Sequence, residues 1–332
     1  MTAYTSRPQG SPRADFLGAN AQVLSIAAFF VLCVIVFSAI SDAFLSAGNI
    51  LNLLRQSAPM LIVAVAMTFV ITTGGIDLSV GSTVALVNAL AALLLSWAVP
   101  WPVVIVALLL IGCAIGALQG WFIAVEGIPS FIVTLAGLSV FRGIALLLTE
   151  GFSIPIDPNS LFVQIGRGWL FGVPFPAFIA VAVVAIGFFA LGHLRFGRHV
   201  TAIGANAEAA RRTGIPVRRT LIWVYVLPGL ASAVAGIIVA ARLGSGSSNA
   251  AVGFELDVIA AVVLGGTSLM GGRGTIIGTI LGALTIAVIG NGLILSHVSP
   301  FFTQIVTGLI ILGAIWLNTR VFSKLSSPIR KP

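Results

Sequence analysis

Charged residues are scarce in this chain. Asp, Glu, Lys and Arg make up 8% of its 332 residues, whereas they make up roughly a quarter of a soluble globular domain. So few charges cannot keep a folded surface in water, which excludes a soluble domain. Hydrophobic residues make up 58% of the chain, and many apolar runs reach the roughly 20 residues that a helix needs to cross a bilayer. This composition predicts an all-α, polytopic membrane protein.

Cysteine and histidine are also rare, and neither is spaced for a metal site or a disulfide framework. Cys33 and Cys113 fall inside apolar runs, where a thiol packs like a small hydrophobic residue. The three histidines are isolated and lack the spacing of metal ligands. The chain also lacks paired catalytic carboxylates, a nucleophile beside a base and a phosphate-binding Gly-Lys motif. We therefore expect no cofactor and no enzymatic activity in this chain.

Apolar runs bounded by Pro, Gly, Asn and charges predict about ten membrane-spanning helices. The second and eighth runs are the shortest of the ten. A transmembrane domain of residues 21–320 is expected between tails of residues 1–20 and 321–332. The spans are expected near 21–40, 58–73, 80–97, 102–120, 129–148, 174–193, 221–241, 257–271, 275–295 and 301–319.

The basic residues set the expected orientation. Although the net charge is +8, the basic residues lie in short segments between apolar runs, so binding to nucleic acid is not expected. With ten spans, 13 of the 17 Lys and Arg residues fall on one side, Arg142 falls inside a span, and Arg55, Arg167 and Arg242 fall on the other side. Because loops rich in Lys and Arg stay in the cytoplasm, both termini are expected there.

Two glycine-rich segments repeat one pattern. Gly74-Gly75-x-x-Leu78-x-x-Gly81 matches Gly265-Gly266-x-x-Leu269-x-x-Gly272, and each follows one apolar run and precedes another. Glycine-interrupted hydrophobic segments at corresponding positions indicate broken helices near a transport path. Polar residues in or near such segments are candidates for the path or its gate: Asp77, Ser79, Asn88, Arg142, Thr267 and Ser268.

Each of these candidates has a structural alternative. Asp77 or Ser79 can cap the start of the third span, and Asn88 can bridge two helices. Arg142 lies about twelve residues into the fifth span, where it either faces a cavity or extends to the membrane surface near Glu150. The sequence leaves these alternatives open.

The loop of residues 194–220 contains a short helix with clear boundaries. Asn206 is a good N-cap, residues 207–213 are mostly strong helix formers, Gly214 suits a left-handed C-terminal position, and Pro216 prevents continuation. A helix of about two turns is marginal by itself in water. It therefore rests either on anionic lipid headgroups or on a protein partner.

The same loop resembles that of bacterial ABC-importer permeases, through Glu208-Ala-Ala-x-x-x-Gly214 followed by Leu227-Pro228. Four further segments, in order, resemble the ribose, xylose and galactose type of sugar permease: MTFVITTGGIDLSVGS, PSFIVTLAGLSVFRGIA, FGRHVTAIGANAEAARRTGIPV and ELDVIAAVVLGGTSLMGGRGT. This resemblance covers residues 50–320, essentially the whole membrane domain.

The resemblance implies a subunit of an importer in the bacterial inner membrane. Two permeases, identical or related, would form the pore. Separate cytoplasmic ATPase subunits would bind ATP, and a periplasmic binding protein would deliver a monosaccharide for alternating access. Contact with the ATPase is expected from these loop residues: Gly204, Asn206, Glu208, Ala209, Ala210, Arg211 and Gly214.

The side opposite the basic loop is expected to hold a docking surface for the binding protein. The longest segment there, residues 149–173, contains Asp157 and Arg167, and Glu255 and Asp257 precede the eighth span. Those two carboxylates can instead be explained by the dipole of the helix that they begin. The alternative function is an ion-coupled secondary sugar transporter, which would need ionisable residues in several spans.

Overall fold

Helices account for nearly all of the regular structure in the computed structural model, which describes residues 12–299, 302, 305–309 and 312–313. Most of the expected tenth span, the C-terminal tail and the first 11 residues lie outside this range. The long helices are α1 (Pro12–Ile40), α2 (Ala47–Thr72), α3 (Val80–Ser96), α4 (Trp101–Ala124), α5 (Ser130–Thr149), α7 (Phe175–Gly192), α10 (Val217–Leu243) and α12 (Ile276–Leu295). The short elements are β1 (Ile154–Pro155), η1 (Leu161–Val163), α6 (Gln164–Arg167), β2 (Trp169–Leu170), β3 (Val173–Pro174), α8 (Arg195–Ala205), α9 (Ala207–Arg212), β4 (Ser245–Gly246) and α11 (Phe254–Leu264).

Seven of the described helices are long and apolar enough to cross a membrane, namely α1, α2, α4, α5, α7, α10 and α12. The apolar helix α3 is shorter, at 17 residues. Large apolar side chains on the outer helices stay exposed, as at Leu147 and Val181, because lipid takes the place of a protein core around them. An all-α membrane protein is therefore confirmed, whereas the count of ten spans and the location of the termini remain predictions.

The prediction of an eighth membrane-spanning helix at residues 257–271 is wrong. Helix α11 covers Phe254–Leu264 and has 11 residues, so it is about 16 Å long, roughly half the thickness of a bilayer core. It ends where Gly265 and Gly266 begin, and no helix is assigned to residues 265–275. The run of residues 257–271 is mostly apolar, but its glycines end the helix early.

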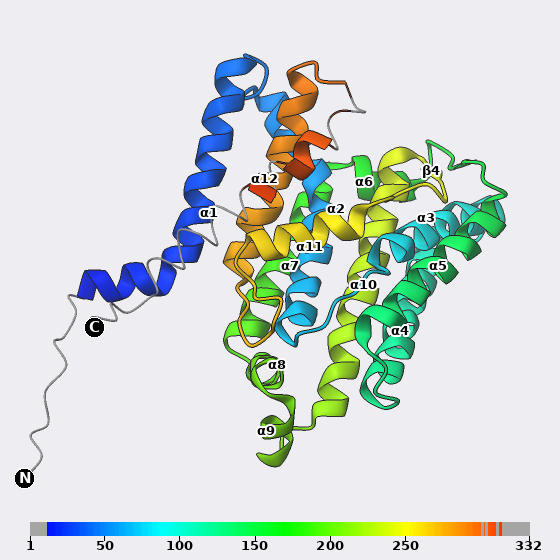
Figure 1. Ribbon diagram of the computed structural model, residues 1–332. Coiled ribbons are helices and arrows are strands. Elements are labelled where there is room, and N and C mark those ends of the chain that lie inside the picture. Colours follow the sequence, from blue (N-terminus) through cyan, green and yellow to red (C-terminus); the bar gives the residue numbers. More distant parts are fainter. Residues whose placement is uncertain (1–11, 300–301, 303–304, 310–311, 314–332) are drawn as a thin grey trace, which may run out of the picture.

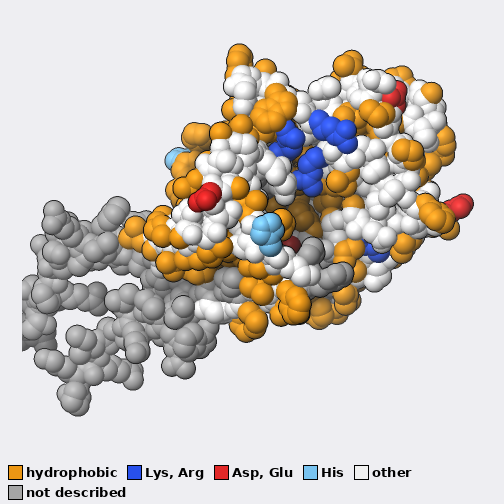
Figure 2. Space-filling model, turned by 90° about the horizontal axis from the view of Figure 1, so that it is seen from above, with side chains coloured by type: hydrophobic (Ala, Val, Ile, Leu, Met, Phe, Trp, Pro, Cys, Tyr) orange, Lys and Arg blue, Asp and Glu red, His pale blue; other side chains and the backbone are white. Residues whose placement is uncertain are grey.

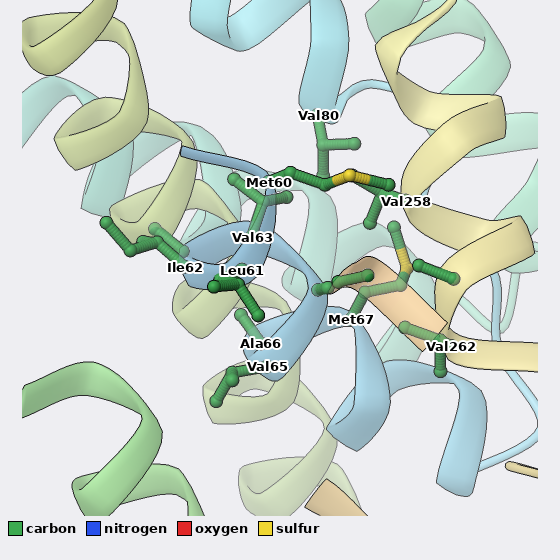
Figure 3. Packing of buried hydrophobic residues seen from close by; sticks show 14 of the residues in the cluster. Met60, Leu61, Ile62, Val63, Val65, Ala66, Met67, Val80, Val258 and Val262 are labelled. Atoms are coloured by element: carbon green, nitrogen blue, oxygen red, sulfur yellow. The ribbon is translucent and has the colours of Figure 1, made fainter. Parts of the chain in front are cut away.

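Helix α2 lies at the centre of the fold. Its residues from Ser57 to Thr72 are all buried, and it packs against α7, α10, α11 and α12. Figure 3 shows Met60 and Met67 of α2 extending toward valines of α3 and α11, among them Val80 and Val258. A helix that is apolar all round is suited to such full burial.

Glycine stripes allow the close helix packing. Gly112 and Gly116 of α4 lie against the backbone of α10, so that a Cβ at Gly112 would be 2.5 Å from the carbonyl oxygen of Gly229. In the same way, Gly282 of α12 contacts the backbone of α11 at Ala261, and Gly278 contacts Gly265, the residue directly after α11. Small residues permit such contacts in membranes, where the hydrophobic effect does not drive helices together.

Two polar contacts also join α2 to α12. Asn49 and Asn291 exchange two amide hydrogen bonds of 2.9 Å. Deeper in the fold, the hydroxyl groups of Thr68 and Thr279 are 2.7 Å apart. Both pairs satisfy polar groups that would otherwise face an apolar environment.

The two ends of the molecule differ (Figure 1). At one end, hereafter the α9 end, lie α8 and α9. At the other, hereafter the β4 end, β4 pairs antiparallel with β1 and β2 pairs with β3.

Candidate functional site

Three backbone segments meet at the α9 end. The amide of Gly272, in the second glycine-rich segment, donates to the carbonyl of Thr72, at the end of α2, over 2.9 Å. Gly204 of α8 lies against both, since a Cβ there would collide with the Thr72 carbonyl and be 2.5 Å from the Gly272 nitrogen. A Cβ at Gly271 would be 3.0 Å from the Gly74 nitrogen, so the two repeated segments also come together. The helix of the basic loop packs onto this junction.

Helix α8 is amphipathic. Its buried residues Gly197, Val200 and Ile203 recur every three positions, which places them on one face of the helix. The ring of Phe196 packs 5.8 Å from that of Phe69 in α2. Helix α8 is thus fixed to the end of α2 by its apolar face.

Helix α9 follows with the boundaries expected from the sequence. The Asn206 side chain accepts a 2.9 Å hydrogen bond from the amide of Ala209, which confirms the N-cap. Gly214 has a φ of +85°, the left-handed conformation that glycine adopts without strain. Pro216 then directly precedes α10.

One face of α9 is open to solvent. Ala210 is buried, whereas Ala209 and Glu208 are exposed. The Glu208 carboxylate pairs with Arg211 and Arg212, each at 3.0 Å. Hydrogen bonds from these two arginines hold the pKa of Glu208 below its ordinary value. The open face therefore carries a fixed pattern of charge.

Asp77 belongs to a buried polar network at the start of α3. Its side chain is 1% exposed and accepts from both the amide and the hydroxyl of Ser79, at 2.8 and 2.7 Å. Gln119 of α4 donates to the same hydroxyl at 2.8 Å. Ser79 directly precedes α3, and its own side chain forms no cap hydrogen bond. Asp77 instead binds the backbone just before the helix, at the Ser79 amide.

The chain after α10 does not continue as a helix. It runs through residues 244–253 before α11 begins at Phe254. Asn88, near the middle of α3, accepts from the amide of Ser247 at 2.6 Å and donates to the carbonyl of Ser245 at 3.4 Å. The Asn88 side chain thus supplies backbone hydrogen bonds that a helix would have supplied itself.

Arg142 of α5 holds the next part of the same segment. One guanidinium nitrogen donates to the carbonyls of Ser248 and Ala250, at 2.5 and 2.8 Å, and the other donates to Ala251 at 3.4 Å. The side chain therefore binds a non-helical segment rather than extending toward Glu150.

The remaining two path candidates lie in the second glycine-rich segment. Thr267 is 3% exposed, and its hydroxyl has no hydrogen-bond partner within the described part of the chain. The backbone amide of Ser268 donates to the carbonyl of Arg273 at 3.0 Å and closes the loop between them. The six candidates thus occupy three separate places: the start of α3, the segment after α10, and the loop before α12.

Three arginines gather at the β4 end. Arg167 donates to the carbonyl of Arg242 at 2.8 Å, the charge of Arg55 acts on Arg242, and the Arg55 guanidinium lies 4.6 Å from the ring centre of Trp169. None of them forms an ion pair with a described carboxylate. Figure 2 shows basic side chains grouped beside a hollow at this end.

The acidic candidates for docking are not all on this surface. Asp157 is exposed and accepts from the amide of Asn159 at 2.9 Å. Glu255 instead points inward against Gly81. Its Oε2 atom is buried and has no hydrogen-bond partner among the described residues. Asp257 lines a cavity. The dipole of α11 alone did not predict that Glu255 would point inward or that Asp257 would line a cavity.

The cavity at the β4 end has a volume of about 820 Å³. It lies between α2, the end of α10, residues 250–253, α11 and α12. Gln56 and Arg242 also line it, and neither was predicted as a site residue. Val84 of α3 and residues 307–308 line it as well, and because these segments are far apart in the sequence, no local motif could have identified the cavity.

Comparisons with known proteins agree along most of the chain. Residues 49–315 match the family described as "Branched-chain amino acid transport system / permease component". A ribose import permease of Haemophilus influenzae is 42% identical over 297 residues, 89% of this chain and 92% of the relative. A ribose import permease of Bacillus subtilis is 43% identical over 309 residues, which are 93% of this chain and 96% of the relative. A xylose transport system permease of Haemophilus influenzae is 36% identical, over 90% of this chain and 96% of the relative. No solved structure matches the chain.

Proposed function

The chain belongs to the branched-chain amino acid transport system permease family, and from this premise we propose that it is the membrane-spanning subunit of an ATP-binding-cassette importer for a monosaccharide. The observation that carries the proposal is its likeness, over nearly the whole length, to ribose import permeases. It is a multi-pass protein of the bacterial inner membrane. Among the described residues, nothing favours the ion-coupled alternative.

The α9 end is the cytoplasmic end in this proposal. Separate ATPase subunits bind the open face of α9, with Glu208, Ala209 and Arg211 in contact and Asn206 and Gly214 fixing the boundaries of the helix. Ala210 anchors α9 from its buried side. Gly204 passes the movement of the loop to the two glycine-rich segments that it touches. ATP is bound by the partner, and this chain holds no cofactor.

The β4 end then faces the periplasm, and both termini lie in the cytoplasm after ten spans. A secreted sugar-binding protein docks at this end, and carboxylates on its surface pair with Arg55, Arg167 and Arg242. These three positive charges form no ion pair with a carboxylate among the described residues. Pairing with an acidic partner surface would therefore stabilise them. The exposed loop that carries Asp157 is also part of the surface. A second permease, identical or related, completes the pore.

Reconstitution tests the proposal. The chain would be placed in vesicles with its ATPase, and uptake of labelled ribose, xylose or galactose would be measured with and without the binding protein. Uptake is expected only with both partners and ATP. Uptake driven by an ion gradient in the absence of the ATPase would contradict the proposal, as would failure of the complete set to transport any of these sugars.

A further inference from the structure

The cavity at the β4 end has a composition suited to a small polar ligand. Its volume of about 820 Å³ lies within the roughly 300–1,000 Å³ typical of small-molecule sites. Its walls are apolar at Met60, Val84 and Ile286, with a few polar groups between them. Such a mixture of apolar wall and sparse hydrogen-bonding groups fits a neutral ligand with several hydroxyl groups.

The floor of the cavity is non-helical. Residues 250–253 line it, and Arg142 binds the carbonyls of Ala250 and Ala251 among them. Irregular backbone at membrane depth is tolerated where it is held by protein or lines a water-filled cavity. Here both conditions are met, since Asn88 and Arg142 hold one side of the segment and the cavity lies on the other.

Asp257 supplies the strongest hydrogen-bond acceptor of the lining. Asp257 belongs to α11 and is exposed. It lines the cavity together with residues 250–253. Among the described residues it forms no ion pair, so its carboxylate is available to a ligand. An ionised carboxylate accepts hydrogen bonds from hydroxyl groups at both oxygens. Gln56, across the cavity on α2, offers an amide as well.

We propose that this cavity is the outward-facing part of the path for the monosaccharide, with Asp257 accepting hydrogen bonds from sugar hydroxyls and residues 250–253 forming its floor. The inference rests on the proposed function. It gives Arg142 and Asn88 the role of positioning residues, because they hold the floor and do not touch the sugar.

A pair of glycine substitutions tests whether sugar passes here. Gly290 lines the cavity, and a Cβ at this position would meet nothing within 4 Å. Gly143 of α5 also faces open space but lies outside the cavity lining, so Gly143→Phe is the matched control. Gly290→Phe is expected to lower uptake at least about tenfold, whereas Gly143→Phe leaves it unchanged.

The result is read against wild type in the same vesicles. Both variants should keep their membrane level and the ATP hydrolysis that the binding protein stimulates, which shows that the complex still assembles. Failure of wild type to take up sugar would overturn the proposed function itself. Normal uptake by wild type and equally normal uptake by Gly290→Phe would overturn the cavity assignment alone.

Cysteine accessibility tests the assignment independently of any misfolding of the Gly290 variant. Asp257→Cys is introduced after Cys33 and Cys113 are replaced by alanine, and intact spheroplasts are treated with a charged, membrane-impermeant thiol reagent. We expect modification of Asp257→Cys, which slows when ribose and binding protein are present. Val181→Cys, on the lipid-facing side of α7, should remain unmodified. An unreactive Asp257→Cys in a properly inserted protein would contradict the proposal.

Discussion

Gly272 donates its backbone amide to the carbonyl of Thr72 at 2.9 Å, and this bond joins the second glycine-rich segment to the end of α2, directly before the first. The segments share a pattern in sequence and a place in space, beside Gly204 of α8. In the proposed importer, this junction lies between the ATPase-binding loop and the membrane helices. A movement of α8 and α9 is expected to reach the end of α2 and the loop before α12 through this junction.

Gly204→Ala is expected to disturb this junction. The new methyl group would collide with the Thr72 carbonyl, and relieving such overpacking costs on the order of 1–3 kcal/mol. Sugar uptake per ATP hydrolysed should fall, and the melting temperature of the purified protein should drop. Gly192→Ala, where the methyl group meets open space, serves as the control. An unchanged ratio of sugar uptake to ATP hydrolysis in Gly204→Ala would show that α8 does not transmit movement from the ATPase.

Glu208→Arg is expected to weaken binding of the ATPase without preventing membrane insertion. The substitution removes both ion pairs of α9 and leaves three neighbouring positive charges on its open face. The dissociation constant of the ATPase should rise at least about tenfold. Glu126→Arg reverses an exposed carboxylate outside α9 and should bind normally. Full sugar-stimulated ATP hydrolysis in Glu208→Arg would show that the coupling assignment is wrong.

The pH dependence of ATPase binding should also reflect Glu208. Its pKa is lowered by Arg211 and Arg212, so the carboxylate remains charged until the pH falls through this lowered value. Binding of the wild type should therefore stay constant between about pH 7 and pH 5 as far as this group is concerned. Glu208→Gln, measured over the same range, shows how much of any change comes from other groups.

Arg142→Ala is expected to destabilise the segment after α10. Three carbonyls lose their donor, and leaving buried acceptors unpaired costs about 1–3 kcal/mol. Both the melting temperature and sugar uptake should fall, and Arg142→Lys should recover part of each because it restores a charged donor. A variant with normal stability but no uptake would instead place Arg142 in direct contact with the sugar.

Asp77→Asn and Asp77→Ala should differ. Asparagine keeps an oxygen that accepts from the Ser79 amide, whereas alanine removes it, at a cost of about 1 kcal/mol for a lost helix-start contact. Transport by Asp77→Asn should remain near that of wild type, and Asp77→Ala should show a lower melting temperature. Loss of transport in Asp77→Asn with normal stability would indicate that the charge itself takes part in gating.

Arg167→Glu is expected to weaken docking of the binding protein. It replaces one of three clustered positive charges with a negative one, so the dissociation constant should rise at least about tenfold, and wild-type binding should weaken as salt is added. Arg219→Glu makes the same charge reversal near the start of α10, at the α9 end, and should not change docking. Equal affinity of both variants for the binding protein would show that the arginine cluster is not part of the docking interface.

The parts of the fold that could be predicted are those with local causes. Asn206, Gly214 and Pro216 act on their immediate neighbours, and the helix between them has the expected bounds. The apolar runs likewise predict most of the long helices, because a bilayer demands continuous apolar length. The expected eighth span failed for the same reason, since apolar length alone did not reveal that Gly265 ends α11.

The site depends on contacts that are distant in sequence. Arg142 binds carbonyls more than 100 residues further along the chain, and backbone carbonyls leave no signature in a sequence. The cavity is similar, because Gln56, Asp257 and Gly290 come from three helices. Polar residues in apolar runs could be recognised as candidates, but their partners could not.

The contacts between α2 and α12 limit how the transporter can move. The Asn49 and Asn291 amides join these helices near the start of α2 and the end of α12. The Thr68 and Thr279 hydroxyls join them within about one turn of their opposite ends, where Gly272 also binds the end of α2. Helices joined near both ends resist sliding and tilting against each other. In the proposed importer, α2 and α12 are therefore expected to form the more rigid wall of the cavity, and alternating access is expected to move the opposite side, residues 244–253 and the end of α10.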